Sequence, residues 1–111
     1  MIKEIKDQEQ ITQLKMLVDL CRSELKAEQV WLFGSRARGD HRPESDWDLL
    51  AILPDDTPEE TLDPMNLWMI RRKSGLHADL LGVRLSEFVD AQDSVTTLSR
   101  MVHDEGVRLD V

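Results

Sequence analysis

The stretch from Phe33 to Leu50, FGSRARGDHRPESDWDLL, spans the connection between two short apolar segments, residues 29–34 and 46–53. Both segments combine β-branched, aromatic and leucine residues, and Gly34 and Pro54 end them, so we expect two strands buried in a sheet. The connection carries a glycine-serine pair and several charged side chains. The sequence therefore predicts a polar turn held between two buried strands.

The sequence on either side of this turn predicts two helices. Apolar side chains recur at the three- and four-residue spacing of one helical face over residues 8–27. A second helix has Asp63 as its N-cap and Pro64 in its first turn, and it ends at Gly75. One stripe of this second helix carries Met65, Trp68, Met69 and Arg72.

The remaining segments predict how the sheet is completed and covered. Residues 76–83, LHADLLGV, are expected to form a third strand, and residues 107–110 an edge strand. Ser86 is expected to cap a short helix, and Asp93 or Ser94 to begin a last helix that reaches Gly106. This order predicts an α/β (α+β) fold with a small mixed β-sheet covered by helices.

Length and composition limit the classes of function. The 111 residues fit one domain, residues 1–111, without a separate substrate lobe. No apolar run is long enough to span a membrane and no signal-peptide core begins the chain, so we expect a cytoplasmic protein. The net charge of −8 argues against direct nucleic-acid binding, whereas a nucleotide bound through a metal remains compatible with it. Cys21, the single cysteine, is expected to be a packed thiol.

The paired aspartates of the opening stretch indicate a metal site. Successive side chains of a strand point to opposite faces, so Asp46 and Asp48 share one face and Trp47 points to the other. Two adjacent carboxylates repel each other unless a cation lies between them. Mg²⁺ suits such a pair, because it prefers oxygen ligands and is often held by one or two carboxylates together with substrate phosphates.

The turn before the aspartates predicts where the phosphates bind. Gly34 lets the chain leave the strand with little steric cost, and Ser35 offers a hydroxyl and a backbone N–H to an anion. Arg36 and Arg38 follow, and the planar guanidinium suits phosphate oxygens.

A third carboxylate is expected from the next strand. Asp79 lies among residues that otherwise indicate a buried core, where an unpaired carboxylate is costly. Placed beside Asp46 and Asp48, it would share the metal ions and accept the proton of an attacking hydroxyl. Taken singly, these residues have simpler explanations: a charged strand edge, an ordinary turn, a structural aspartate and solvated arginines. One arrangement explains them together.

The other aromatic and histidine residues favour structural roles. The three tryptophans are expected to be core or interface aromatics rather than surfaces for base stacking: Trp31, Trp47 and Trp68. His77 is expected to be structural, and His41 and His103 to lie on the surface.

A glycine-serine pair, ten residues and then Asp-x-Asp resembles the signature of the DNA polymerase β-like nucleotidyltransferase superfamily. Gly34 and Ser35 take the first positions, and Asp46 and Asp48 take the metal-binding positions. Asp79 matches the third carboxylate by its place in the following strand. Trp47 stands where the family has a small aliphatic residue, which we expect to affect packing only. The motifs span residues 30–83, and the chain length is similar to that of the minimal nucleotidyltransferases (MNT).

This resemblance implies a function and a partner. MNT proteins of this kind are antitoxins that transfer AMP from ATP to a tyrosine of a HEPN-domain ribonuclease toxin. The resemblance implies Gly34, Ser35 and Arg36 as nucleotide-binding residues, and the three aspartates as catalytic residues that hold two Mg²⁺ ions. The chain contains no tyrosine, so a tyrosine acceptor belongs to another protein and a hetero-oligomer is expected. Two alternatives stay open: a module that masks its partner without catalysis, and a nucleotidyltransferase for small molecules such as aminoglycosides.

Overall fold

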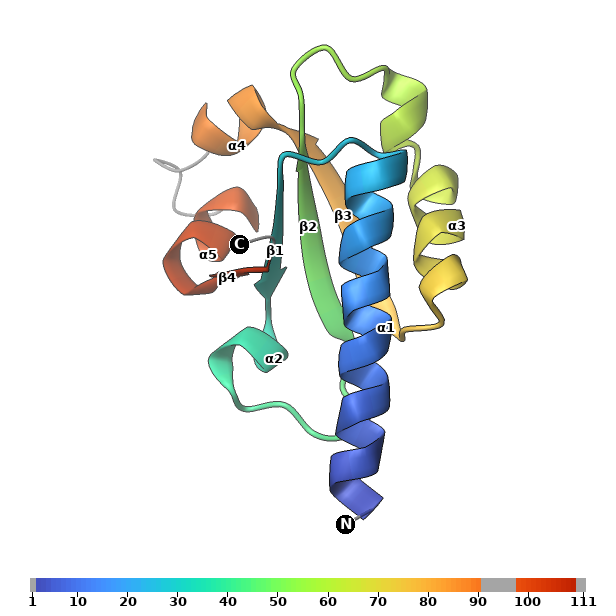
Figure 1. Ribbon diagram of the computed structural model, residues 1–111. Helices are drawn as coiled ribbons and strands as arrows, with labels where there is room; N and C mark the ends of the chain where they lie inside the picture. Colours follow the sequence, from blue (N-terminus) through green and yellow to red (C-terminus); the bar gives the residue numbers. More distant parts are fainter. Residues whose placement is uncertain (1, 91–97, 110–111) are drawn as a thin grey trace.

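The computed structural model describes residues 2–90 and 98–109 and contains a four-stranded sheet (Figure 1). Its strands are β1 (Gln29–Phe33), β2 (Trp47–Leu53), β3 (Ala78–Arg84) and β4 (Val107–Arg108). They lie in the order β3-β2-β1-β4, with β1 antiparallel to both neighbours and β2 parallel to β3. The mixed sheet and its edge strand after the last helix confirm the predicted fold class.

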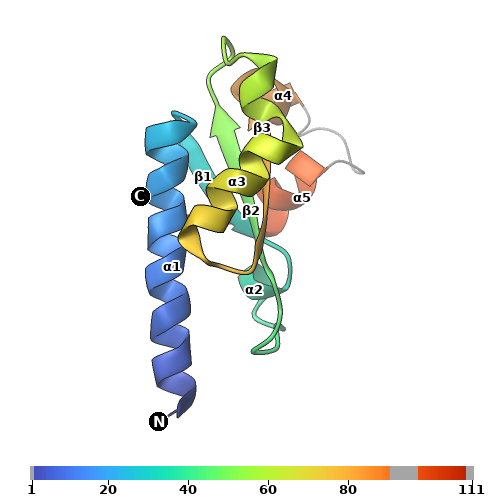
Figure 2. The ribbon, with the colours of Figure 1, turned by 90° about the vertical axis from the view of Figure 1, so that its right-hand side faces the viewer.

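Two helices pack on one face of this sheet. They are α1 (Ile2–Glu24) and α3 (Pro64–Ser74), which lie side by side in both ribbon views (Figures 1 and 2). The cluster beneath them contains buried residues of both helices and alternate residues of β2, namely Leu17, Val18, Cys21, Leu67, Ile70, Leu49, Ala51 and Leu53, together with Leu25 directly after α1. The predicted packing of Cys21 is confirmed, because its side chain is fully buried.

The other residues of β2 point to a second cluster, formed with α4 (Leu85–Asp90) and α5 (Leu98–Glu105). Its buried members are Phe33, Leu50, Ile52, Phe88 and Val102. Strand β2 is thus covered on both faces, which explains its continuous apolar run rather than an alternating pattern. Site residues on β2 are therefore carried by the most constrained strand of the sheet.

The observed ends of α1 and α3 can be compared with the ends that the sequence predicted. The first helix spans Ile2–Glu24, so it begins before the expected residue 8 and ends before the expected residue 27. At its end Lys26 adopts a left-handed conformation (φ 57°), and the Leu25 and Ala27 amides donate to Cys21 O. The cap of α3 is confirmed: Asp63 Oδ1 accepts from Met65 N at 2.9 Å, and Gly75 closes the helix with φ 76°.

Two further helix boundaries differ from the sequence analysis. Helix α4 begins at Leu85, so Ser86 lies inside the first turn instead of capping it, and the Ser86 N–H donates to Asp55 Oδ1 at 2.8 Å. The expected start of the last helix at Asp93 or Ser94 lies outside the described residues, whereas its end at Glu105 agrees with the prediction. A short 3-10 helix, η1 (Glu59–Leu62), lies in the connection before α3.

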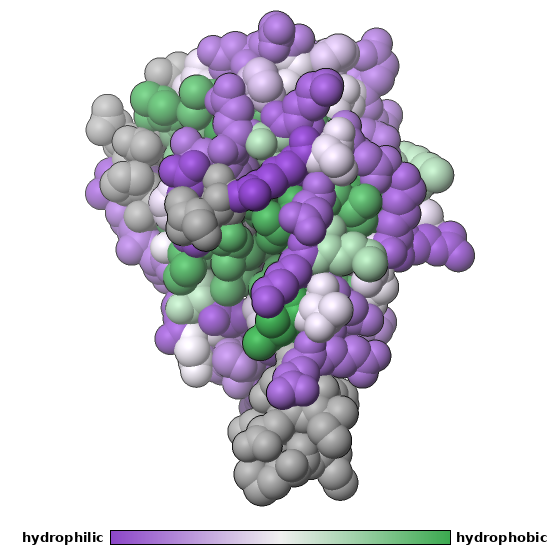
Figure 3. Space-filling model, in the orientation of Figure 1, coloured by the Kyte–Doolittle hydropathy of each residue, from purple (hydrophilic) through white to green (hydrophobic). Residues whose placement is uncertain are grey.

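The surface is mostly hydrophilic on the side that α1 covers, with hydrophobic patches between α1 and α5 (Figure 3). None of the helices in residues 2–90 and 98–109 combines the length and the apolarity that crossing a bilayer requires. Trp31 and Trp47 pack against the two core clusters, as the sequence predicted, whereas Trp68 is 45% exposed and is not a core residue.

Candidate active site

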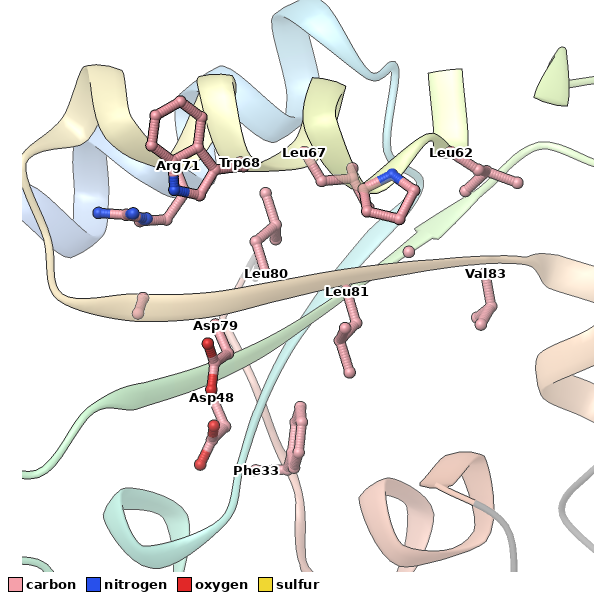
Figure 4. A pocket seen from close by; sticks show the side chains of 13 residues that line it. Phe33, Asp48, Leu62, Leu67, Trp68, Arg71, Asp79, Leu80, Leu81 and Val83 are labelled. Atoms are coloured by element: carbon pink, nitrogen blue, oxygen red, sulfur yellow. The ribbon is translucent and has the colours of Figure 1, made fainter. Parts of the chain in front are cut away.

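Two of the predicted carboxylates lie next to each other on neighbouring strands. Asp48 on β2 is paired in register with Asp79 on β3. Figure 4 shows both side chains on the same side of the sheet, together with Phe33. Asp46 comes directly before β2 and is exposed. The expected arrangement, in which Asp79 lies beside Asp48 on the adjacent strand, is therefore present.

Asp79 differs from the expectation in its burial. The sequence suggested a carboxylate within the core, but β3 lies at the edge of the sheet and the Asp79 side chain is exposed. The cost of burying a charge therefore does not apply to it. An edge position leaves Asp79 accessible to a molecule that approaches from outside the sheet.

The turn at Gly34 brings the backbone against the Asp48 carboxylate. Gly34 has φ 75° and ψ −158°, a conformation open essentially to glycine alone. A Cβ atom at this position would overlap Asp48 Oδ2 and lie 3.2 Å from Asp48 Cγ. The helix α2 (Ser35–Arg38) begins immediately afterwards, so Ser35 lies in the turn that touches the carboxylate.

The carboxylates of Asp46, Asp48 and Asp79 concentrate negative charge at the site. Partial burial raises the pKa of Asp48 above its ordinary value, and the charges of Asp79 and Asp46 raise it further. Arg38 opposes this rise in the pKa of Asp48, although it also pairs with Asp40 and Glu105. The local arrangement therefore leaves negative charge that the chain only partly compensates.

This donor set fits a hard divalent cation. Carboxylate oxygens are the preferred ligands of Mg²⁺, and a cation would relieve the repulsion that raises the pKa of Asp48. Within the described residues, no three carboxylate, histidine or cysteine side chains converge as a complete metal cluster. A bound metal would therefore need ligands beyond this chain, such as substrate phosphates and water.

Arg36 has a role that the sequence analysis missed. Its guanidinium donates to Ser45 O at 2.9 Å and 3.1 Å and to Pro43 O at 3.1 Å, and it lies 4.3 Å from the centre of the Trp47 ring. Arg36 thereby ties the loop before Asp46 to α2. Its predicted contact with the nucleotide remains a prediction. Trp47, for which the sequence indicated packing only, provides the aromatic face on which this arginine lies.

An open groove of about 770 Å³ extends from the carboxylates around the edge of the sheet. Its lining includes Asp48, Asp79 and Leu81 on one side of β3 and Trp68 and Arg71 of α3 on the other (Figure 4). The sequence indicated a helix that carries Trp68 and Arg71, but not that these two residues border this groove. Only the packing of α3 against the sheet brings them there.

Comparisons with known proteins agree with this geometry. A family model described as a nucleotidyltransferase domain matches residues 3–106. A search of curated proteins gave no match. Among solved structures, the chain is similar to a putative nucleotidyltransferase from Sulfolobus solfataricus, with 22% identity and a TM-score of 0.56 over 93% of this chain and 84% of the other.

Two further similar structures are toxin-antitoxin complexes. One, a toxin-antitoxin with AMP-PNP, is 26% identical with a TM-score of 0.56, over 85% of this chain and 69% of that one. The other is a tri-AMPylated Shewanella oneidensis HEPN toxin in complex with MNT antitoxin, 24% identical with a TM-score of 0.51 over 90% and 70% of the two chains. With a family model that covers nearly its whole length and a carboxylate pair in register beside a glycine-serine turn, this chain belongs to the nucleotidyltransferase domain family.

Proposed function

We propose that this protein is an Mg²⁺-dependent adenylyltransferase antitoxin, which transfers AMP from ATP to a tyrosine hydroxyl of a partner HEPN-domain toxin and thereby neutralises it. The sequence contains no tyrosine, which supports a tyrosine acceptor on another protein. The proposed active form is accordingly a hetero-oligomer. A reaction that consumes ATP is consistent with the expected cytoplasmic location.

The observation that carries this proposal is the in-register pairing of Asp48 with Asp79 beside Gly34. Asp46, Asp48 and Asp79 would hold two Mg²⁺ ions, which when bound neutralise triphosphate charge and favour deprotonation of the acceptor hydroxyl. Asp79, exposed at the sheet edge, is positioned to accept the proton of a hydroxyl that comes from outside. The acceptor oxygen then forms a bond to the α-phosphorus, and the bond to pyrophosphate breaks.

The turn residues bind and orient the nucleotide in this proposal. Gly34 and Ser35 offer backbone N–H groups and a hydroxyl to the phosphates next to Asp48, and Arg36 holds the loop that precedes Asp46. The 26% identical toxin-antitoxin structure contains AMP-PNP, an analogue of ATP, which supports ATP as the nucleotide. The HEPN toxin of the Shewanella complex carries AMP units, which supports a protein acceptor of the same kind here.

The test is AMP transfer to a HEPN-domain ribonuclease toxin that this chain neutralises in cells. The two proteins are incubated with ATP and Mg²⁺, and the partner is analysed by mass spectrometry for the added mass of AMP and for the modified residue. We expect AMP on a tyrosine of the partner and loss of its ribonuclease activity. Omission of Mg²⁺, or replacement of ATP by an analogue whose bridge between the α- and β-phosphates cannot be cleaved, is expected to abolish both effects.

A double variant separates catalysis from masking. Asp46→Ala with Asp48→Ala removes two carboxylates from the site, while Asp56→Ala with Glu60→Ala removes two exposed carboxylates at the far end of β2 as a charge-matched control. We expect the first variant to lose protection of the partner and the control to keep it. Full protection by a folded Asp46→Ala, Asp48→Ala variant would instead assign neutralisation to masking.

A further inference from the structure

The two edges of the sheet are unequal. On one side the sheet ends with β4, which has two residues, and a short edge strand gives little opportunity for added pairing. On the other side it ends with the seven residues of β3. Within the described residues, β3 makes backbone hydrogen bonds only to β2. The outward N–H and C=O groups of β3 therefore form a long open edge.

The centre of this edge lacks the charged or proline residues that usually prevent strand addition. Residues 80–83 are Leu, Leu, Gly and Val, and Leu81 is 41% exposed. The groove of about 770 Å³ follows this strand and is continuous with the carboxylate site, because Asp48 and Asp79 also line it. Figure 4 shows β3 lying between α3 and the two aspartates. A chain segment that pairs with β3 would thus pass directly beside Asp79.

Helix α3 gives this groove a basic and aromatic wall. Arg71 and Arg72 lie with their guanidinium carbons 5.9 Å and 5.3 Å from the centre of the exposed Trp68 ring. No carboxylate among the described residues forms an ion pair with either arginine. These cations occur in a chain whose net charge is −8. The wall therefore fits a segment that combines apolar and acidic side chains.

We propose that β3 and α3 bind an extended, acidic segment of the acceptor protein as an additional strand of the sheet. The segment pairs its backbone with β3 and places carboxylates near Arg71 and Arg72. This inference rests on the proposed function, since it identifies how the acceptor reaches the same site. Neighbouring strands lie about 4.8 Å apart, so a residue opposite Asp79 has its side chain within reach of both carboxylates.

The test uses synthetic peptides of about eight residues, the length of a typical strand, that alternate valine and glutamate around a central tyrosine. Binding to the full chain is followed by NMR, through amide shifts and hydrogen exchange of residues 78–84. Two matched peptides serve as controls: one with lysine in place of glutamate, and one with N-methylated alternate amides. We expect the first peptide to protect alternate β3 amides and both controls to bind weakly or not at all.

A charge reversal tests the α3 wall separately. Arg71→Glu, at the α3 arginine that lines the groove, is expected to weaken binding of the glutamate peptide roughly five-fold, the effect of replacing an attractive surface pair by a repulsive one. Lys15→Glu makes the same change on α1, outside the groove, and is expected to leave the affinity unchanged. Thermal unfolding of both variants checks that the fold is retained.

The outcomes separate this inference from the proposed function. Peptide protection of β3 without any AMP transfer supports the binding mode while the function fails. AMP transfer to a HEPN partner without protection of β3 overturns the binding mode alone. Equal binding of the N-methylated peptide also overturns it, because strand pairing needs those amides. Protection that grows with protein concentration in the absence of peptide overturns it in favour of a second copy of this chain.

Discussion

Gly34 is the residue at which backbone conformation and site chemistry depend most directly on each other. Its positive φ lets the chain turn sharply out of β1, and its missing Cβ leaves room for the Asp48 carboxylate. Gly39 also has a positive φ, 88°, but a Cβ atom there would meet nothing within 4 Å. A comparison of alanine substitutions at the two glycines therefore distinguishes the effect of backbone strain from the effect of displacing the Asp48 carboxylate.

We expect Gly34→Ala to reduce AMP transfer by about 100-fold or more, because the added methyl group displaces Asp48 from its place opposite Asp79. Strain adds a loss of about 1–3 kcal/mol in the free energy of unfolding. Urea unfolding and AMP transfer measure the two effects. Gly39→Ala, the control, is expected to lose about 1 kcal/mol and to keep activity. Equal loss of activity in both variants would argue against contact with Asp48 as the cause.

Asp48 itself is expected to destabilise the fold when no cation is bound. Its pKa is raised in the folded state, so its contribution to stability is greatest at low pH and falls as the pH rises through that pKa. Asp48→Asn is therefore expected to raise the urea midpoint at pH 7 without divalent ions, to leave it nearly unchanged at pH 3, and to abolish AMP transfer. Asp56→Asn, on an exposed loop, is the control. A lower midpoint at pH 7 would contradict this interpretation.

At the scale of elements, α2 and the loop that follows it act as one unit through Arg36. The guanidinium bonds to carbonyls of Ser45 and Pro43 and lies over Trp47, the first residue of β2. The loop that ends at Asp46 is thus attached to α2 and to the first residue of β2. A change at Arg36 is expected to act on the position of Asp46 even without a contact to the nucleotide.

Arg36→Lys tests this coupling, because lysine keeps the charge but loses the planar, multiple hydrogen bonds. We expect a loss of about 1–2 kcal/mol in the free energy of unfolding and faster hydrogen exchange of the Ser45 amide, which donates to Arg42 O. AMP transfer is expected to fall in parallel. If transfer falls while the loop exchanges as in the wild type, Arg36 acts on the nucleotide and not on the loop.

At the scale of the whole molecule, one small domain carries a site that opens to the outside. The sheet is covered by α1 and α3 on one face and by α4 and α5 on the other, and Asp79 lies on its uncovered β3 edge, beside Asp48 of β2. In the proposed reaction, this chain would bind the nucleotide and another protein would supply the acceptor. The stability of this chain therefore depends on the two clusters that cover the faces of the sheet, the larger of which lies beneath α1 and α3.

The thiol of Cys21 reports on the cluster beneath α1 and α3. Burial raises the pKa of Cys21 to about 12 from its ordinary 9.0, so the thiol adds stability below pH 9 that is lost between pH 9 and 12. We expect modification by a disulfide reagent at pH 8 to require unfolding, with a rate that rises with urea in step with the loss of helical signal. A rate near that of a free thiol in buffer alone would show that α1 opens independently.

Much of the fold was determined by local sequence. Asp63, Pro64 and Gly75 placed the ends of α3, and the apolar runs placed β1 and β2, because caps, turn residues and hydrophobic runs act within a few residues. The left-handed Lys26 that follows α1 has no comparable signal, since its conformation depends on how the next strand leaves the helix. Ser86 was misplaced for a related reason: its partner, Asp55, lies far away in the chain.

In the candidate site, too, some features follow from nearby residues and others from contacts between distant segments. The sequence by itself predicted which residues carry the proposed chemistry, because the glycine-serine turn and the Asp-x-Asp pair lie at the required spacing within one segment. Only the tertiary structure decided that Asp79 pairs with Asp48 in register, that β3 is an open edge, and that Trp68 and Arg71 border the groove. The physical reason is that strand order and helix packing are set by contacts between distant segments, which no local pattern encodes.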